Sequence, residues 1–281
     1  MGLLSRVCVT RPCFFGVCLS MQENPDRDEL QGGRTPLMIA GHEGNVDAIE
    51  YLLSLDDVIG VEEVNARDVT GTTALTAAAS NNQVEAMKLL YAEGADANVP
   101  CADGRAALHH AAYSGKYDAA KWLVKEAKVP VNQPAALTNG AGLGHTPLLV
   151  AAYHGHQRIV KLLLRYKANP DQPAKDGATA LIAASSAGQM VCVKLLLKAG
   201  ADPRRRLEGG ETAAIVTNDR RISGLLYVAE REAWEKDPQS AGGAASSNSD
   251  DGDVDEEIED EDDLDEEEEE EEVMIPPHEE L

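Results

Sequence analysis

The sequence predicts an all-α repeat solenoid followed by a disordered acidic tail, and three observations carry this prediction. A short pattern that starts with Thr-Pro-Leu, or a variant of it, recurs along most of the chain with a base period of 33 residues. Each copy is followed by two stretches with the apolar spacing of amphipathic helices. Residues 250–281 hold 21 of the 49 carboxylates and no Lys or Arg, a composition that cannot bury enough apolar surface to fold.

The repeat starts at six positions, which are separated by 38, 33, 40, 33 and 33 residues. Two insertions, of about five and about seven residues, reconcile the longer steps with the base period. The starts are Thr35, Thr73, Ala106, Thr146, Thr179 and Thr212. A fixed period of this length indicates stacked helical units, none of which can bury its apolar face alone.

The fourth unit, GHTPLLVAAYHGHQRIVKLLL over residues 144–164, shows why a helix pair is expected. Thr146 can cap the first helix with its hydroxyl, and Pro147 suits the first helical position, where no backbone N–H is needed. Gly155 should end that helix, because glycine adopts the left-handed conformation without steric cost. Asn82 fills the same position in the second unit. The Asn-, Asp-, Gly- and Pro-rich links between units predict projecting β-hairpin-like loops.

Together these motifs resemble the ankyrin-repeat family over residues 32 to about 230. The resemblance rests on the T-[PA]-L start, the paired alanines, the turn glycine, the leucine run and the G-A-D-x-N link at one period. Two departures stand out: the histidine expected after T-P-L is present only as His109, and the sixth unit has Arg221 where glycine is expected. That decayed unit and the helix-like stretch 222–237 are expected to form a C-terminal cap.

Three regions follow from these patterns. We predict a disordered leader over residues 1–31, an ankyrin solenoid with its capping helix over 32–237, and a disordered Ser/Gly-rich and then polyacidic tail over 238–281.

The resemblance implies a non-enzymatic interaction module that binds a partner protein through its concave face, which the hairpin tips and the exposed side of the first helices form. The candidate contact residues are Arg67, Arg105, Tyr113, His145, Tyr153 and His154. Further positions of the same kind are Arg34, His42, Glu43, Thr72, Ser80, Asn81, Ser114 and Ala178. Tyr113 and Tyr153 occupy equivalent positions in adjacent units, so they should stand side by side, and exposed tyrosines are favoured contact residues.

The acidic tail has two interpretations. It is either a segment that keeps the solenoid in solution or an arm that binds and escorts a basic client protein. A basic patch in the last hairpin, formed by Arg204, Arg205 and Arg206, could fold onto the tail until such a client competes, or could serve nuclear import. Ser247 precedes the acidic run and is a candidate phosphosite. Nucleic acid is not expected as a partner, because the tail would repel phosphates.

No pattern in the chain predicts catalysis, a metal site or a cofactor. The five cysteines form no CxxC pair and no disulfide framework. His145, His154 and His156 lie within one window, but they fall at a hairpin position, an exposed turn and a turn position that tolerates varied residues. We interpret them as products of the repeat rather than as metal ligands. The alternative function is a regulatory or targeting subunit of an enzyme, with a tail that only solubilises.

The location of the chain is predicted from its ends and its apolar runs. No apolar run reaches the roughly 18 residues that span a membrane, and Arg11 and Pro12 interrupt the N-terminal apolar stretch, which makes it a poor signal peptide. We therefore expect a monomer in the cytoplasm, the nucleus or both, with acylation of Cys8, Cys13 or Cys18 left open. The last residues, His278-Glu279-Glu280-Leu281, resemble a retention signal and leave the ER lumen as an alternative.

Overall fold

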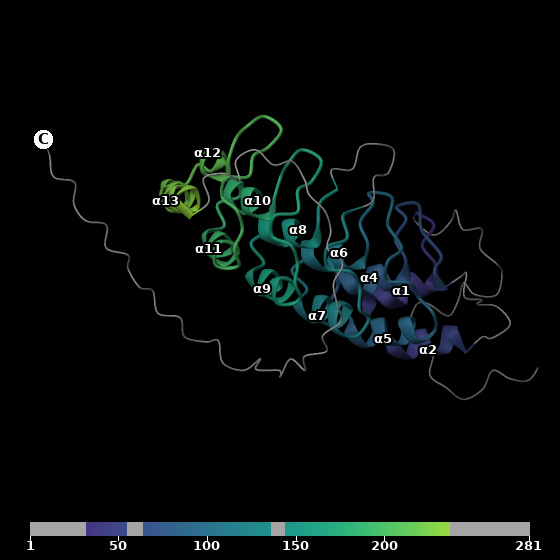
Figure 1. Ribbon diagram of the computed structural model, residues 1–281. Helices are drawn as coiled ribbons and strands as arrows, with labels where there is room; N and C mark the ends of the chain where they lie inside the picture. The colour runs from purple at the N-terminus through teal and green to yellow at the C-terminus, as the bar shows by residue number, and fades with distance from the viewer. Residues whose placement is uncertain (1–31, 55–63, 136–143, 237–281) are drawn as a thin grey trace, which may run out of the picture. The chain divides into compact units, whose positions relative to one another are not determined.

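The computed structural model describes residues 32–54, 64–135 and 144–236, and these consist of helices and loops without a named strand (Figure 1). The chain separates into two compact units, Met1–Ala241 and Gly242–Leu281, of which the second lies wholly outside the described residues. The predictions for the leader, for Ser247 and for the acidic tail with its last four residues also fall outside them. The following description concerns the first unit alone.

The helices stack in two layers, in which each helix packs against its neighbours in the same layer and against its partner in the same unit (Figure 1). The first layer holds α1 (Pro36–Glu43), α4 (Ala74–Ser80), α6 (Ala107–Tyr113), α8 (Pro147–Tyr153), α10 (Ala180–Ser186) and α12 (Ala213–Val216). The second holds α2 (Val46–Leu53), α5 (Val84–Ala92), α7 (Tyr117–Lys125), α9 (Gln157–Arg165), α11 (Met190–Lys198) and α13 (Arg220–Lys236). This arrangement confirms the predicted solenoid of helix pairs.

The first helices begin where the threonines predict. The hydroxyls of Thr35, Thr73 and Thr146 each accept the backbone N–H three residues later at 3.2 Å, which satisfies one of the orphan donors of the helix. Ala106 has no hydroxyl, so the His109 N–H bonds to the Ala106 carbonyl at 3.0 Å instead, and the Nδ1 of His109 accepts the backbone N–H of Ala106 at 3.3 Å. The other nitrogen, Nε2, donates to the carbonyl of His145 at 3.1 Å and so ties the third unit to the fourth.

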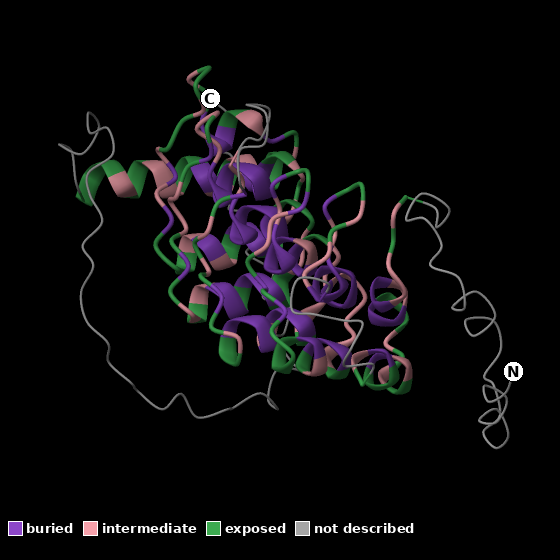
Figure 2. Cartoon of the chain, turned by 90° about the vertical axis from the view of Figure 1, so that its right-hand side faces the viewer, coloured by how far each residue is buried: buried purple, intermediate pink, exposed green. Residues whose placement is uncertain are grey.

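One elongated core runs through the helix stack, as the buried residues in Figure 2 show. The small residues of the paired alanines let neighbouring first helices approach closely, and the second alanine of a pair is fully buried in four of the units. These are Ala112, Ala152 and Ala184, with Ala79 in the second unit. Trp122 lies in the leucine run of α7, is 8% exposed, and packs edge-on against Tyr91 with ring centroids 5.5 Å apart. It is a core residue, as its position predicts.

The links between units are hairpin-like loops, as predicted. Each is closed by a backbone hydrogen bond, for example from Cys101 N–H to the Arg105 carbonyl at 2.8 Å. The hairpin that contains the second insertion is closed at its base in the same way, from Ala135 N–H to the His145 carbonyl at 2.9 Å. Adjacent hairpins are joined where Ala102 N–H donates to the Thr70 carbonyl at 2.7 Å. The hairpins therefore support one another along the stack.

The turn between the two helices of a unit explains His156. Gly115 has φ +69°, and a Cβ atom there would lie 2.6 Å from the His156 ring, which covers this glycine and donates from Nε2 to the Tyr113 carbonyl at 3.1 Å. The amides of Gln83 and Gln189 cover the turn glycines of their preceding units, Gly44 and Gly155, in the same way. The position accepts different residues, as the sequence indicates, and in these three units its side chain also lies against the preceding turn.

The turn between the two helices of the second unit is built differently. Asn82 stands where the other units have glycine, adopts φ +62°, and carries the side chain that glycine lacks. The residue that follows this turn position in the next unit is Lys116 rather than Gln or His. The Asn82 side chain itself reaches the next unit, because its Oδ1 accepts the Ala119 N–H at 3.0 Å and its Nδ2 donates to the Asp118 carboxylate at 2.9 Å.

The last unit is shortened and capped. Its first helix, α12, has four residues, whereas α13 has 17 and begins two residues before the predicted stretch. The guanidinium carbon of Arg204 lies 5.5 Å from the centre of the Trp234 ring, and Nη1 of Arg204 donates to the Ala233 carbonyl at 3.4 Å. These contacts hold the last turns of α13 against the final hairpin.

Candidate partner-binding surface

Four of the predicted contact residues form one surface cluster, which we call the aromatic cluster: Arg105, Tyr113, Tyr153 and His154. The His154 ring lies between the two tyrosines, with its centroid 4.5 Å from that of Tyr113 and 5.2 Å from that of Tyr153. Both contacts are edge-on, with interplanar angles of 71° and 83°. The Arg105 guanidinium carbon lies 5.2 Å from the centre of the Tyr113 ring. A histidine thus joins the two tyrosines that the sequence placed in equivalent positions.

The repeat itself creates this cluster. Tyr113 is the last residue of α6, Tyr153 is the last residue of α8, and His154 is the C-cap of α8. The tyrosines are 40 positions apart, which exceeds the base period, but the extra residues fall in the hairpin whose base Ala135 and His145 close. The helices therefore keep their stacking, and equivalent positions of adjacent units come together.

The cluster combines exposed area with restricted geometry. Tyr113 is 46% exposed and Tyr153 is 49% exposed. Partial burial lowers the pKa of His154, and electrostatic repulsion by its neighbours, including the Arg105 guanidinium, lowers it further. A neutral imidazole at neutral pH can pack against the tyrosine rings and still donate or accept one hydrogen bond.

His145 belongs to the same face but is not part of the aromatic cluster. Its ring is partly buried, and burial lowers its pKa although Asp176 opposes the change. Its carbonyl accepts hydrogen bonds from His109 Nε2 and from the Ala135 N–H. The backbone of His145 therefore fixes the base of the hairpin, whatever its side chain contacts.

Arg67 is exposed, and the structure places it in a different hairpin from the cluster. Its guanidinium donates to the carbonyl of Pro100 in the next hairpin and, through Nε, to the Gly71 carbonyl at 3.4 Å. These bonds brace two hairpins against each other, so Arg67 has a structural contact that its sequence position did not reveal.

A hollow of about 310 Å³ lies between the first two units. Residues in or beside α1, α4 and the hairpin that precedes α4 line it: Arg34, Met38, His42, Asp68, Thr72, Ala77, Ser80 and Asn81. Five of the eight are variable positions of the kind predicted to face a partner. The Arg34 guanidinium faces the Asp68 carboxylate at 3.9 Å across this hollow.

The three arginines of the predicted basic patch differ in their surroundings. The Arg204 side chain is 15% exposed and its Nε lies 2.8 Å from a carboxylate oxygen of Asp202. Arg205 and Arg206 are exposed, and Nη1 of Arg206 donates to the Gly210 carbonyl at 2.8 Å. Arg204 therefore belongs to the cap with Trp234, and Arg205 and Arg206 are the residues that a partner can reach.

Comparison with protein families identifies the repeat. A family model described as "Ankyrin repeats (3 copies)" matches residues 56–135 and 132–206. A single "Ankyrin repeat" model matches residues 32–69. The matched residues cover the first five units that the sequence and the structure define.

Curated relatives share these repeats within different proteins. The chain is 31% identical over 143 residues to the tyrosine-protein kinase HTK16 of Hydra vulgaris, which is 51% of this chain and 18% of that protein. It is 48% identical over 75 residues to the zinc finger CCCH domain-containing protein 24 of Oryza sativa subsp. japonica, over 25% of this chain and 9% of that protein. It is 36% identical over 90 residues to the Notch-regulated ankyrin repeat-containing protein of Xenopus tropicalis, over 32% of this chain and 77% of that protein.

The chain thus spans less than a fifth of the length of the first two relatives. Among solved structures, the ankyrin repeat domain of Bcl-3, described as a unique member of the IkappaB protein family, matches with a TM-score of 0.55 and 24% identity. The match covers 69% of this chain and 99% of that domain, and it shows a shared fold. None of the helices in the described part of this chain has the length and apolarity to cross a membrane. These matches, together with the stacked helix pairs, show that the chain belongs to the ankyrin-repeat family.

Proposed function

We propose that this protein is a non-enzymatic binding module that contacts a partner protein through the face formed by its hairpins and first helices, with the aromatic cluster as its centre. Ankyrin repeats generally mediate protein–protein interactions, and their fold is typically non-enzymatic. The observation that carries the proposal is the His154 ring between two half-exposed tyrosines.

The chemistry of the cluster suits binding. Tyrosine and arginine are enriched among the residues that dominate interface energies. The ring contacts among His154, Tyr113 and Tyr153 restrict these side chains before a partner arrives, so that less rotamer entropy is lost on binding. The hollow beside Arg34 and His42 offers a second contact on the same face.

A pull-down from cell extract with the full-length chain as bait, followed by affinity measurement with the captured partner, tests this proposal. Tyr113→Ala and Tyr153→Ala should each weaken binding about tenfold or more, since central tyrosines contribute at least about 1–2 kcal/mol. Tyr51→Ala is the matched control, because Tyr51 is 56% exposed but lies on α2 in the second layer. Equal losses in all three variants would refute the assignment to this face.

A basic client is the second part of the proposal, and the tail motivates it. The last 32 residues carry 21 carboxylates, whereas the other 249 residues hold 28 acids and 25 bases. A concentrated negative charge attracts basic proteins in a salt-dependent manner. Removal of residues 250–281 should therefore weaken binding and flatten its salt dependence. Binding that is indifferent to salt and to the tail would leave only the ankyrin face.

The alternative is a regulatory or targeting subunit of an enzyme. In that case a stoichiometric complex should survive deletion of residues 250–281, and catalytic activity should copurify with it. We place the protein in the cytoplasm, the nucleus or both, as a monomer with a folded region over residues 32–237. Fluorescence microscopy and sedimentation of the full-length chain test the location and the oligomeric state.

A further inference from the structure

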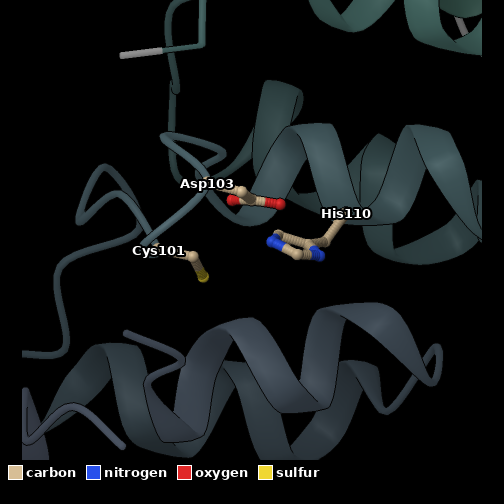
Figure 3. A group of neighbouring side chains, drawn as sticks. All are labelled: Cys101, Asp103 and His110. Atoms are coloured by element: carbon tan, nitrogen blue, oxygen red, sulfur yellow. The ribbon is translucent and has the colours of Figure 1, made fainter. Parts of the chain in front are cut away.

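Three side chains with the ligand types of transition metals meet beside the third hairpin. Cys101 and Asp103 lie in the hairpin, and His110 lies on α6, which follows it. One ligand atom of each lies within 4.8 Å of those of the other two. Figure 3 shows the His110 ring edge directed to the side where Cys101 and Asp103 lie. The group is distinct from the aromatic cluster, although Arg105 lies next to both.

Two atoms of this group, His110 Nε2 and Cys101 Sγ, have little or no hydrogen bonding among the described residues. Nε2 of His110 is buried and has no hydrogen-bond partner among the described residues. A buried, unpaired imidazole nitrogen costs free energy unless it gains a partner. Cys101 is 3% exposed, and among the described residues its Sγ has one hydrogen-bond partner, the Thr72 hydroxyl at 3.9 Å. A ligand that accepts lone pairs from both nitrogen and sulfur would satisfy the two groups together.

We propose that Cys101, Asp103 and His110 bind one divalent transition-metal ion of the zinc type, with water or a partner side chain as the fourth ligand. The metal replaces the thiol proton, which passes to solvent. A thiolate and a carboxylate then balance the 2+ charge, so the site is neutral when filled. Three protein ligands with one open position are a common zinc arrangement.

The distances allow this coordination with small side-chain movements. Zinc bonds of about 2.0 Å to nitrogen or oxygen and about 2.3 Å to sulfur place the ligand atoms of a tetrahedral ion roughly 3.3–3.6 Å apart. Closing the group from at most 4.8 Å requires shifts of about 1 Å. The Asp103 side chain is 49% exposed, so the ion can enter from solvent on that side.

Neighbouring residues tune the site. The Thr72 hydroxyl can turn to donate a hydrogen bond to the Cys101 thiolate once the proton has left. Arg105 opposes the metal, because its Nε lies 3.6 Å from Asp103 Oδ2 and competes for that carboxylate. No recognised spacing marks these residues in the sequence, since they come from a hairpin and a helix.

Cobalt titration of the full-length chain tests the proposal. The variant background C8S, C13S and C18S leaves Cys101 and Cys192 as the two thiols. We expect one equivalent of Co²⁺ to produce a thiolate-to-cobalt absorption band, and Zn²⁺ to displace it. C101S should abolish the band, and H110Q should weaken Co²⁺ binding by more than about tenfold. C192S is the matched control and should keep the band, because Cys192 is the other buried thiol of the described residues.

A variant that binds Co²⁺ more tightly distinguishes direct coordination from an indirect effect, because misfolding would only weaken metal binding. R105A removes the competitor of the metal for Asp103 and should tighten Co²⁺ binding severalfold. Circular dichroism must show that C101S and H110Q keep their helices. A thiolate band that persists in C101S, or its absence in the parent chain at a saturating Co²⁺ concentration, would overturn the proposal. Metal bound by the acidic tail gives no thiolate band and so does not imitate the result.

Discussion

The imidazole of His154 rests edge-on against the ring of Tyr113, with centroids 4.5 Å apart, although the two residues belong to different repeat units. This contact means that the binding face is shaped jointly by adjacent units. We expect a double-mutant cycle with Tyr113→Ala and His154→Ala to give a coupling of about 0.5–1 kcal/mol in the free energy of unfolding. Urea denaturation of the four proteins measures it. The pair Tyr113 and His145 serves as a reference, whose coupling should be close to zero.

Acid should destabilise the protein through His109. Burial lowers its pKa from 6.5 to about 4, so the unfolded chain binds more protons than the folded chain between these values. The contribution of His109 is therefore complete above pH 6.5, declines as pH falls, and is lost below pH 4, with a total of about 3 kcal/mol. Urea denaturation from pH 7.5 to 4, with a chelator present, should show this decline. His109→Gln should flatten it, and an unchanged slope would contradict the assignment.

Gly115→Ala should destabilise the solenoid for two reasons that can be separated. An alanine must adopt φ near +69°, which costs about 1–2 kcal/mol, and its Cβ would overlap the His156 ring. Gly188→Ala has a similar φ of +73° but nothing within 4 Å of the added atom, so only the backbone cost should appear. The measured loss should be larger at Gly115, and adding His156→Ala should remove the excess. Equal losses at the two glycines would show that His156 does not press on the turn.

Thr146→Ala should cost about 1 kcal/mol of stability, because the Leu149 N–H loses its acceptor at the buried start of α8. Thr146→Ser keeps the hydroxyl and should cost much less. Thermal unfolding monitored by circular dichroism compares the two variants. If serine and alanine are equally destabilising, the threonine methyl rather than the cap is what matters.

Trp234→Ala should loosen the end of α13, since the Arg204 guanidinium loses the ring beneath it. We expect faster amide hydrogen exchange in the last turns of α13 and little change in α8, because openings at the end of a solenoid are local. Tyr227→Ala is the matched control, as Tyr227 is 55% exposed on the same helix. Equal acceleration by both changes would argue against the Arg204 contact.

Sequence alone determined the helix pairs, their number and their stacking order. A threonine at five of the six starts, small residues in the first helices and turn residues recur with the repeat, and at these positions local propensity agrees with tertiary packing. Tyr113 and Tyr153 could be placed on one face for the same reason, since equivalent positions of adjacent units become neighbours. The capping helix α13 was also foreseeable, since the sequence predicts a helix-like stretch over residues 222–237.

Only the tertiary structure decided which side chains contact one another between units. The ring of His156 fits over Gly115, His109 accepts the Ala106 N–H and reaches the His145 carbonyl of the next unit, and the Arg204 guanidinium lies against the Trp234 ring. The meeting of Cys101 with His110 is of the same kind. The repeat pattern states which positions are equivalent, but these contacts depend on how a long side chain reaches into the next unit, and that geometry follows from stacking distance and rotamer rather than from any periodic signal.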